Sequence, residues 1–156
     1  MLIRQAACAR EDFDAIIHHR QAMFFDMGNH DETALDAMSA SFRPWLQRKM
    51  EAAEYLAWFV VAPDSSIAAG LGLWLMDWPP HMIGAGSRWR GNILNVYTEP
   101  AHRRRGYARA LMKVALEWCA ANQVGAVILH ASPEGRGLYE SFGFTPTNEM
   151  RINAPV

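Results

Sequence analysis

Apolar residues recur along this chain with two periods, and each period predicts its own kind of element. Residues 11–27 place apolar side chains three and four positions apart, which is the spacing of an amphipathic helix, and Gly28 is a typical helix end. A second helical region covers residues 32–54, and we expect it to bend or break near Pro44 because proline has no amide hydrogen to donate. These two helices follow a short strand predicted over residues 2–6.

Strands are predicted where apolar residues form continuous runs rich in β-branched and aromatic side chains. Two such runs, residues 56–62 and 67–76, are joined by the turn residues 63–66 and favour a hairpin, whereas the proline- and glycine-containing segment 77–90 favours a loop. The remaining predicted elements are a strand over residues 93–97, a helix opening at 102–109 with apolar positions as far as 119, a wholly buried strand over 126–130, a short helix over 135–142, a strand beginning at 144–147 and a last strand over 149–153.

The order of these elements, β-α-α-β-β-β-α-β-α-β, predicts an α/β fold in which helices are layered on one mixed sheet. We expect six to seven strands, mostly antiparallel, flanked by about four helices. No internal repeat or linker divides the chain. Residues 1–156 are therefore predicted to form a single domain, which is large enough to bury a proper core.

Composition and charge narrow the possible functions. Hydrophobic residues make up 51% of the chain, charged residues 20%, and the formal net charge is −1, as in ordinary globular proteins. That near-neutral total argues against a protein that works on nucleic acid or on an anionic membrane. Cys8 and Cys119 are expected to be buried and predict no disulfide, and the histidines show no metal-ligand spacing. With no signal peptide and no long apolar segment, we expect a cytoplasmic protein that binds neither metal nor membrane.

The exception to this even charge is a basic segment between the strand over 93–97 and the following helix. Arg103, Arg104 and Arg105 stand where the helix dipole is already positive, so each cation costs about 0.3–1 kcal/mol. Gly106 beside them is a poor helix former. Both features are explained if an anion binds the free amide hydrogens of the helix start, since glycine lets the backbone approach it and the arginines neutralise it. A solvated basic helix end without a ligand is the alternative interpretation.

Three motifs give this chain a resemblance to a known family. Arg103-x-x-Gly106-x-Ala108, placed after a strand, is similar to the coenzyme A pyrophosphate loop of the GNAT superfamily of N-acetyltransferases, whose pattern is Gln/Arg-x-x-Gly-x-Gly/Ala. Residues 138–144, Leu-Tyr-Glu-Ser-Phe-Gly-Phe, closely resemble the last motif of that family, and residues 3–6 with the helix after them resemble the first. The resemblance spans nearly the whole chain, and it implies the GNAT fold with acetyl-CoA as co-substrate.

The resemblance also implies where acetyl-CoA lies. The pantetheine arm would insert beside the central strand, and backbone N–H groups near Val96 and Tyr97 would stabilise the oxyanion. Ser132 occupies the position at which many family members carry an asparagine that bonds the pantetheine, and its hydroxyl could serve in place of the amide. The residues expected to bind the co-substrate are Val96, Tyr97, Thr98, Arg103, Arg104, Arg105, Gly106, Tyr107, Ala108, Arg109 and Ser132.

Acetyl transfer needs a neutral amine, an oxyanion site and an acid that protonates the leaving thiolate. Tyr139 is the predicted acid, because a phenol with a pKa of about 10 can reprotonate a thiolate and the family places a tyrosine here against the coenzyme sulfur. A tyrosine that only fills the core is the alternative. The central strand carries no titratable base, so Asn92 or Asn95 is expected to hold a water that relays the amine proton. Further candidates for the base are Glu99, Glu149 and Asp77.

The acceptor amine would bind between the first two helices and the loop 77–90, where large side chains suit an amphipathic or cationic molecule and equally suit a homodimer contact. We expect direct transfer to a primary amine in a ternary complex, since neither cysteine lies in a motif for a covalent nucleophile. A small-molecule amine is favoured, and a protein amine stays open. The competing hypotheses are a non-catalytic acyl-CoA-binding or sensing module and, against the charge balance, a nucleic-acid-binding module. The large side chains expected beside the acceptor amine are Trp74, Trp78, His81, Met82 and Trp89.

Overall fold

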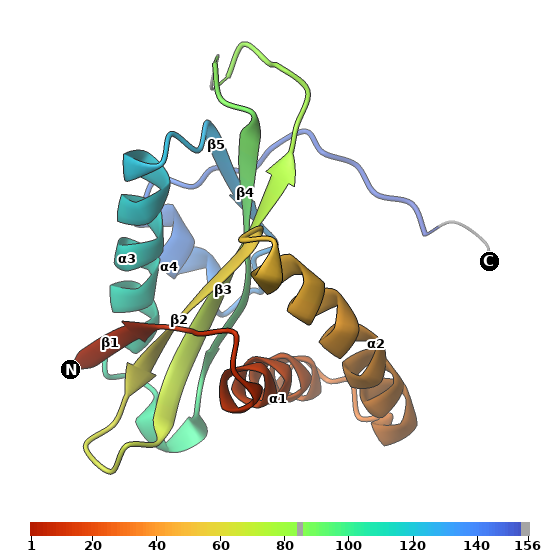
Figure 1. Cartoon of the computed structure of the whole chain (residues 1–156), viewed down its shortest axis with the longest axis vertical. Helices are drawn as coiled ribbons and strands as arrows, with labels where there is room; N and C mark the ends of the chain where they lie inside the picture. The colour runs from red at the N-terminus through yellow and green to blue at the C-terminus, as the bar shows by residue number, and fades with distance from the viewer. Residues whose placement is uncertain (84–85, 154–156) are drawn as a thin grey trace.

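A five-stranded sheet runs through the centre of the computed structural model, which describes residues 1–83 and 86–153 (Figure 1). The strands lie in sequence order; the first four pair antiparallel, and the fifth pairs parallel to the fourth. A helix connects the fourth strand to the fifth, as a parallel pair requires. The strands are β1 (Leu2–Gln5), β2 (Tyr55–Val61), β3 (Ile67–Asp77), β4 (Trp89–Thr98) and β5 (Ala126–Leu129).

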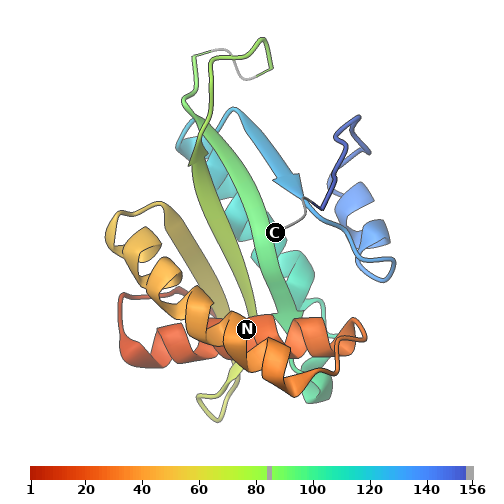
Figure 2. The ribbon, with the colours of Figure 1, turned by 90° about the vertical axis from the view of Figure 1, so that its right-hand side faces the viewer.

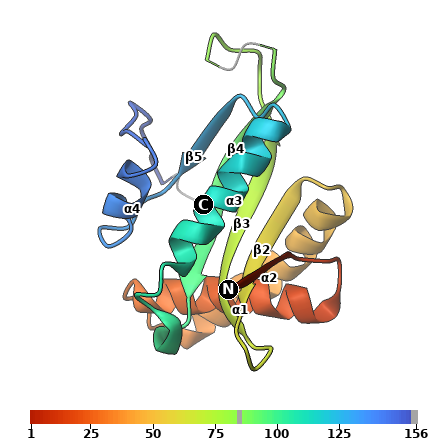
Figure 3. The same cartoon turned by 90° about the vertical axis from the view of Figure 1, so that its left-hand side faces the viewer.

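Helices cover both faces of this sheet. The first two helices lie together across one face (Figure 2), and the third lies along the opposite face (Figure 3). The described helices are α1 (Arg10–Asp26), α2 (Glu32–Glu51), α3 (Tyr107–Ala121) and α4 (Arg136–Glu140), with a single 3-10 turn, η1 (Pro100–His102), between β4 and α3.

Each face of the sheet has its own hydrophobic core. On the α3 face, Leu111, Met112 and Ala115 are completely buried against the strands. On the other face, Ile16 of α1 and Leu46 of α2 are buried. Because both faces are covered, β2 and β3 are near-continuous apolar runs and not alternating ones. The predicted α/β class with a mixed, mostly antiparallel sheet and four helices is confirmed.

The strand count is the main correction to the prediction. Residues 144–147 and 149–153 form no strands, so the described sheet has five strands and not six to seven. Met150 and Ile152 are 94% and 87% exposed, so this segment buries too little apolar surface to offset the entropy of ordering a strand. Pro146 also lacks the N–H that a ladder needs.

The remaining corrections are local. β5 is half-buried instead of wholly buried, because an edge strand has a neighbour on one side only. α2 continues unbroken through Pro44, since Phe42 and Leu46 on either side of it are held in the core. Cys8 is exposed, whereas Cys119 is buried as expected.

The connection between β3 and β4 is shorter than the predicted loop over 77–90. Asp77 belongs to β3, and Trp89 and Arg90 belong to β4. Residues 84–85 of this segment lie outside the described residues. Among the helices that the structure describes, none combines the length and apolar character needed to cross a membrane.

Candidate functional site

β4 and β5 separate halfway along β4. Pairing between β4 and β5 begins at Arg90 opposite Ala126 and ends at Ile93 opposite Leu129, although β4 continues to Thr98. Within the described chain, the last residues of β4 therefore have no strand beside them on the β5 side. Unpaired main-chain groups along a strand edge can accept an extended ligand as if it were another strand.

A β-bulge lies in this same half of β4. Gly70 and Gly72 of β3 face Tyr97 and Leu94, so two residues of β4 stand opposite one residue of β3. Asn95 takes a left-handed conformation, with φ of 55°. Its side chain therefore lies on the α1/α2 face together with that of its neighbour Leu94, before the strand resumes its alternation.

Buried hydrogen bonds fix the bulge in place. Arg20 Nη1 donates to Asn95 Oδ1 at 2.9 Å, and Asn95 Nδ2 donates to Tyr55 Oη at 2.9 Å. Tyr55 is 2% exposed, and burial raises the pKa of its hydroxyl, so the phenol stays neutral. Gly72 makes room for it, because a Cβ atom there would lie 2.0 Å from Tyr55 Oη. The bulge is thus held by α1, β2 and β3 at once.

The basic segment follows β4 and opens α3. Gly106 is the N-cap of α3 with φ of 78°, a left-handed conformation that glycine adopts without strain, and a Cβ atom there would meet nothing within 4 Å. The first helical hydrogen bond runs from Ala110 N to Gly106 O at 3.0 Å. The amide hydrogens before Ala110 consequently have no intrahelical acceptor, and they point out of the helix start beside open space.

The arginines of this segment do not act alike. Arg103 turns back to α1, where it pairs with Asp26 and donates from Nε to Thr98 O at 3.0 Å. Arg105 donates from Nη2 to Ala101 O at 3.2 Å. Along the described chain, Arg104, Arg105 and Arg109 form no ion pair with a carboxylate, and Arg109 lies over the ring of Phe142, 5.5 Å from its centre. Three of the predicted arginines are therefore available to a phosphate, and Arg103 anchors the loop.

Tyr139 lies on α4, half-buried against the core of the α3 face. Burial raises the pKa of its hydroxyl, and that hydroxyl makes no hydrogen bond to the residues that the structure describes. A Cβ atom at Gly135 would lie 2.8 Å from the ring, so glycine is needed for Tyr139 to sit here. Ser132 Oγ accepts from Gly135 N at 3.2 Å and so fixes the turn before the helix. Tyr139 is a neutral phenol with a free donor.

The predicted relay residues differ in their surroundings. Both polar atoms of the Asn95 amide are engaged in the bulge, whereas Asn92 Oδ1 is buried and has no partner in the described chain.

Glu99, a candidate for the base, is held by α1. Its Oε1 lies 2.9 Å from His18 Nε2 and 3.6 Å from His19 Nε2, so it is no free loop residue. Of the other base candidates, Glu149 pairs with Arg90 and Asp77 is exposed beside Arg88. In the described part of the chain, no group of three His, Cys, Asp or Glu side chains is arranged to hold a metal ion.

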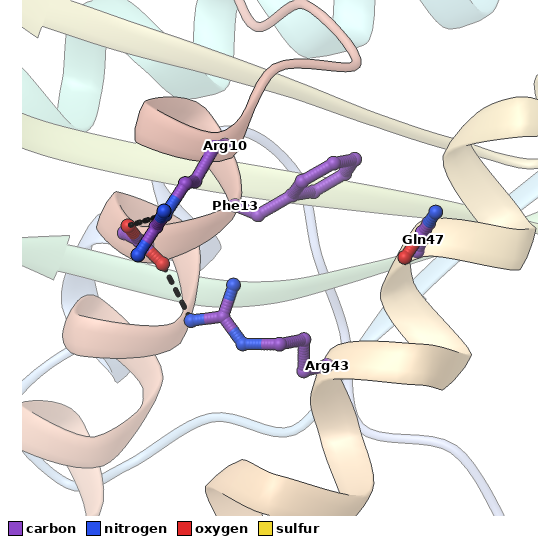
Figure 4. Close-up of a pocket in the computed structure, with 5 residues that line it drawn as sticks. Arg10, Phe13, Arg43 and Gln47 are labelled. Atoms are coloured by element: carbon purple, nitrogen blue, oxygen red, sulfur yellow. Dashed lines mark hydrogen bonds and ion pairs between the residues drawn. The ribbon is translucent and has the colours of Figure 1, made fainter.

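An open groove of about 550 Å³ lies elsewhere, between the start of α1 and the second half of α2 (Figure 4). Its walls are Phe13 and Gln47 with a charged set in which Arg10 and Arg43 both face Asp14. The charges of this groove are partnered within it. Among the described residues, none of the buried side-chain N and O atoms that lack a hydrogen-bond partner belongs to a residue lining this groove.

Comparison with known proteins identifies the family. A model of the acetyltransferase (GNAT) family matches residues 13–144. The chain belongs to the GNAT family. A GCN5-related N-acetyltransferase from Ralstonia eutropha JMP134 is 34% identical over 98% of this chain and 97% of its own, with a TM-score of 0.89. Among curated proteins, none matches this sequence.

More distant structures share the GNAT fold. A predicted acetyltransferase with acetyl-CoA from Clostridium acetobutylicum is 23% identical over 97% of this chain and 95% of its own, with a TM-score of 0.84. An aminoglycoside acetyltransferase from an uncultured soil metagenomic sample is 19% identical over 99% of this chain and 97% of its own, with a TM-score of 0.70.

Sequence reasoning missed the residues that hold the bulge of this GNAT protein. Arg20 is separated from Asn95 by 75 positions, and Asn95 from Tyr55 by 40. In the sequence, Arg20 is an ordinary polar position of a helix and Tyr55 the first residue of an apolar run. Nothing local distinguishes them, so only the tertiary structure assigns them to the site.

Proposed function

We propose that this GNAT protein transfers an acetyl group from acetyl-CoA to a primary amine by direct attack in a ternary complex. The observation that carries the proposal is the unpaired edge of β4 beyond Ile93, which leads to the glycine-capped start of α3. An extended pantetheine arm fits along that edge. The diphosphate fits the α3 start, because Gly106 leaves open space there and Arg104 and Arg105 supply positive charge.

The bulge provides the oxyanion site in this proposal. Acetyl-CoA supplies a thioester carbonyl, and main-chain N–H groups at Val96 and Tyr97 stabilise the negative charge that develops on its oxygen. Asn95 is locked by two hydrogen bonds, so these amides are held in place before the donor arrives. A preorganised donor needs no rearrangement as the charge forms.

Tyr139 is the proposed general acid toward the CoA thiolate. Its raised pKa keeps the phenol protonated at neutral pH, and its hydroxyl has no competing partner among the described residues. The attacking amine must lose a proton on the other side of the reaction. Asn92 Oδ1, which is buried and unpartnered in the described chain, is proposed to accept a hydrogen bond from a water, and that water relays the amine proton outward.

The test is thermal unfolding with and without acetyl-CoA, followed by release of the free CoA thiol with a panel of amines. Ligand at 100 times its Kd should stabilise the protein by about 2.7 kcal/mol. Arg105→Glu and Gly106→Glu should lose that shift. Arg48→Glu makes the same charge change as Arg105→Glu at an exposed position of α2 and should keep it.

The outcomes separate the competing functions. A shift that both loop variants lose, with thiol release in the presence of an amine, supports the enzyme. The same shift without thiol release for any amine indicates an acyl-CoA-binding or sensing module. No shift at saturating acetyl-CoA overturns the proposal.

A further inference from the structure

Polar atoms without partners gather on one side of the sheet. Five buried side-chain N or O atoms lack a hydrogen-bond partner in the described part of the chain, and four of them lie between α1, α2, β3 and β4. Buried polar groups of native proteins are normally paired, so a cluster of unpaired ones marks a place where a bound water, ion or ligand completes the bonds. The four atoms are Arg20 Nε, Ser39 Oγ, Trp74 Nε1 and Asn92 Oδ1.

Ring contacts and strand pairing connect three of these residues, and the position of Ser39 on α2 places it beside them. Arg20 lies over the ring of Phe42, 4.6 Å from its centre, and Ser39 precedes Phe42 by one turn of α2. Trp45, one turn further, stacks on Phe42 at 5.5 Å and meets the ring of Trp74 at 5.4 Å. Asn92 stands directly opposite Trp74 in the β3–β4 ladder, so their side chains share the α1/α2 face.

The charge of Arg20 has no counter-ion in the described chain. Its guanidinium is bound by the neutral Asn95 amide and flanked by the rings of Phe24 and Phe42. Burial lowers the pKa of this arginine, which reflects the cost of a charge away from water. The carboxylates of Asp26 and Asp36 on the same two helices are taken by other side chains. A cation in this position is stabilised most by an anion that arrives with a ligand.

The four unpaired atoms also define the polarity of that ligand. Arg20 Nε, the Ser39 hydroxyl and Trp74 Nε1 are donors, whereas Asn92 Oδ1 is an acceptor. Donors around a guanidinium suit an oxyanion, which arginine binds in a bidentate manner, and the acceptor suits the N–H of an amine. The ring of Trp45, stacked on Phe42, meets that of Trp74, opposite Asn92, and so connects the two ends.

We propose that the acceptor amine carries an anionic oxygen group, a carboxylate or a phosphate, which pairs with Arg20. This inference rests on the proposed function and names the substrate class of the same site. The anion pairs with Arg20 on the α1/α2 face, and the amine faces the thioester at the bulge, where transfer takes place. The body of the substrate packs on the tryptophans.

The experiment compares amines that differ only in the anion. Phenylalanine, leucine and β-alanine are each assayed beside their amides, and phosphoethanolamine beside ethanolamine, by acetyl-CoA-dependent thiol release. The anionic member of a pair should have a kcat/KM at least about tenfold higher. The carboxylate and phosphate pairs then distinguish the two sources of the anion.

Arg20→Gln keeps an amide donor but removes the charge, and it should abolish the preference for the anionic member of each pair, whatever its effect on the rate with the neutral member. Arg43→Gln is the matched control, because Arg43 is exposed and pairs with Asp14 on the outer side of the same helices. A loss of activity that is equal for anionic and neutral amines in Arg20→Gln would show that Arg20 only supports the bulge. That result would overturn the proposal.

A binding experiment distinguishes a failure of the anion site from a failure of the proposed acetyl transfer. The N-acetylated forms of the same acids and amides are added with CoA, and the shift in melting temperature is measured. Stabilisation by the acids alone, lost in Arg20→Gln and kept in Arg43→Gln, supports the anion site even if no amine is acetylated. Equal or absent effects of acids and amides overturn the anion site, and acetyl-CoA binding by itself still stands.

Discussion

The stability of this protein should fall between neutral and mildly acidic pH because of one buried histidine. His19 is 2% exposed, lies against the rings of Phe59 and Tyr97, and leaves no room for a Cβ atom at Gly70. Burial lowers the pKa of His19 to about 4, and the charge of His18 adds to the effect. The folded protein therefore keeps this imidazole neutral at pH values where the unfolded chain protonates it.

The sign and size follow from proton linkage. A folded-state pKa below the unfolded value of 6.5 means that the unfolded chain binds more protons between pH 6.5 and about 4. The stabilisation is fully present above pH 6.5 and is lost as the pH falls toward 4. The two pKa values correspond to a loss of about 2 kcal/mol between roughly pH 7.5 and pH 5. Glu99 lies 3.6 Å from His19 Nε2 and favours the protonated ring, so this is an upper value.

The assay is urea unfolding at a series of pH values, on the wild type and on His19→Gln. The variant should be less stable at pH 7.5 but should lose less free energy of unfolding on acidification. His18→Gln is the matched control, since His18 is exposed and its removal leaves in place the buried ring and the larger, burial part of the lowered pKa of His19. Parallel pH curves for the wild type and His19→Gln would refute the reasoning.

Two further predictions concern the site. Tyr139→Phe removes the proposed acid and should lower kcat by about 10²-fold or more, with little change in the melting-temperature shift caused by acetyl-CoA; an unchanged kcat would remove Tyr139 from the mechanism. Gly72→Ala places a Cβ atom against Tyr55 Oη and should destabilise the protein by about 1–3 kcal/mol in urea unfolding. Gly137→Ala, at a position with nothing within 4 Å, serves as its control, and equal stability of both variants would contradict the crowding argument.

Much of the fold could be predicted from local patterns. The apolar periodicity of α1 and α3, the apolar runs of β2 and β3 and the turn between them are short-range features, and each element forms close to its expected bounds. The same local logic failed for residues 144–153, where Phe144 and the following residues resemble a strand start. Strand formation there depends on a neighbouring edge and on burial, which are not local properties.

The sequence by itself indicated the family and the helix start that we propose binds the co-substrate, because the glycine cap at Gly106 and the arginines beside it belong to an element that the chain forms locally. Only the tertiary structure decided the shape of the proposed transfer site around the bulge. The bulge at Asn95, its anchoring by Arg20 and Tyr55, and the unpaired atoms beside them join segments 40 and 75 positions apart. Their chemistry comes from burial and from which groups lack partners, and a side chain acquires those properties only when distant segments pack together.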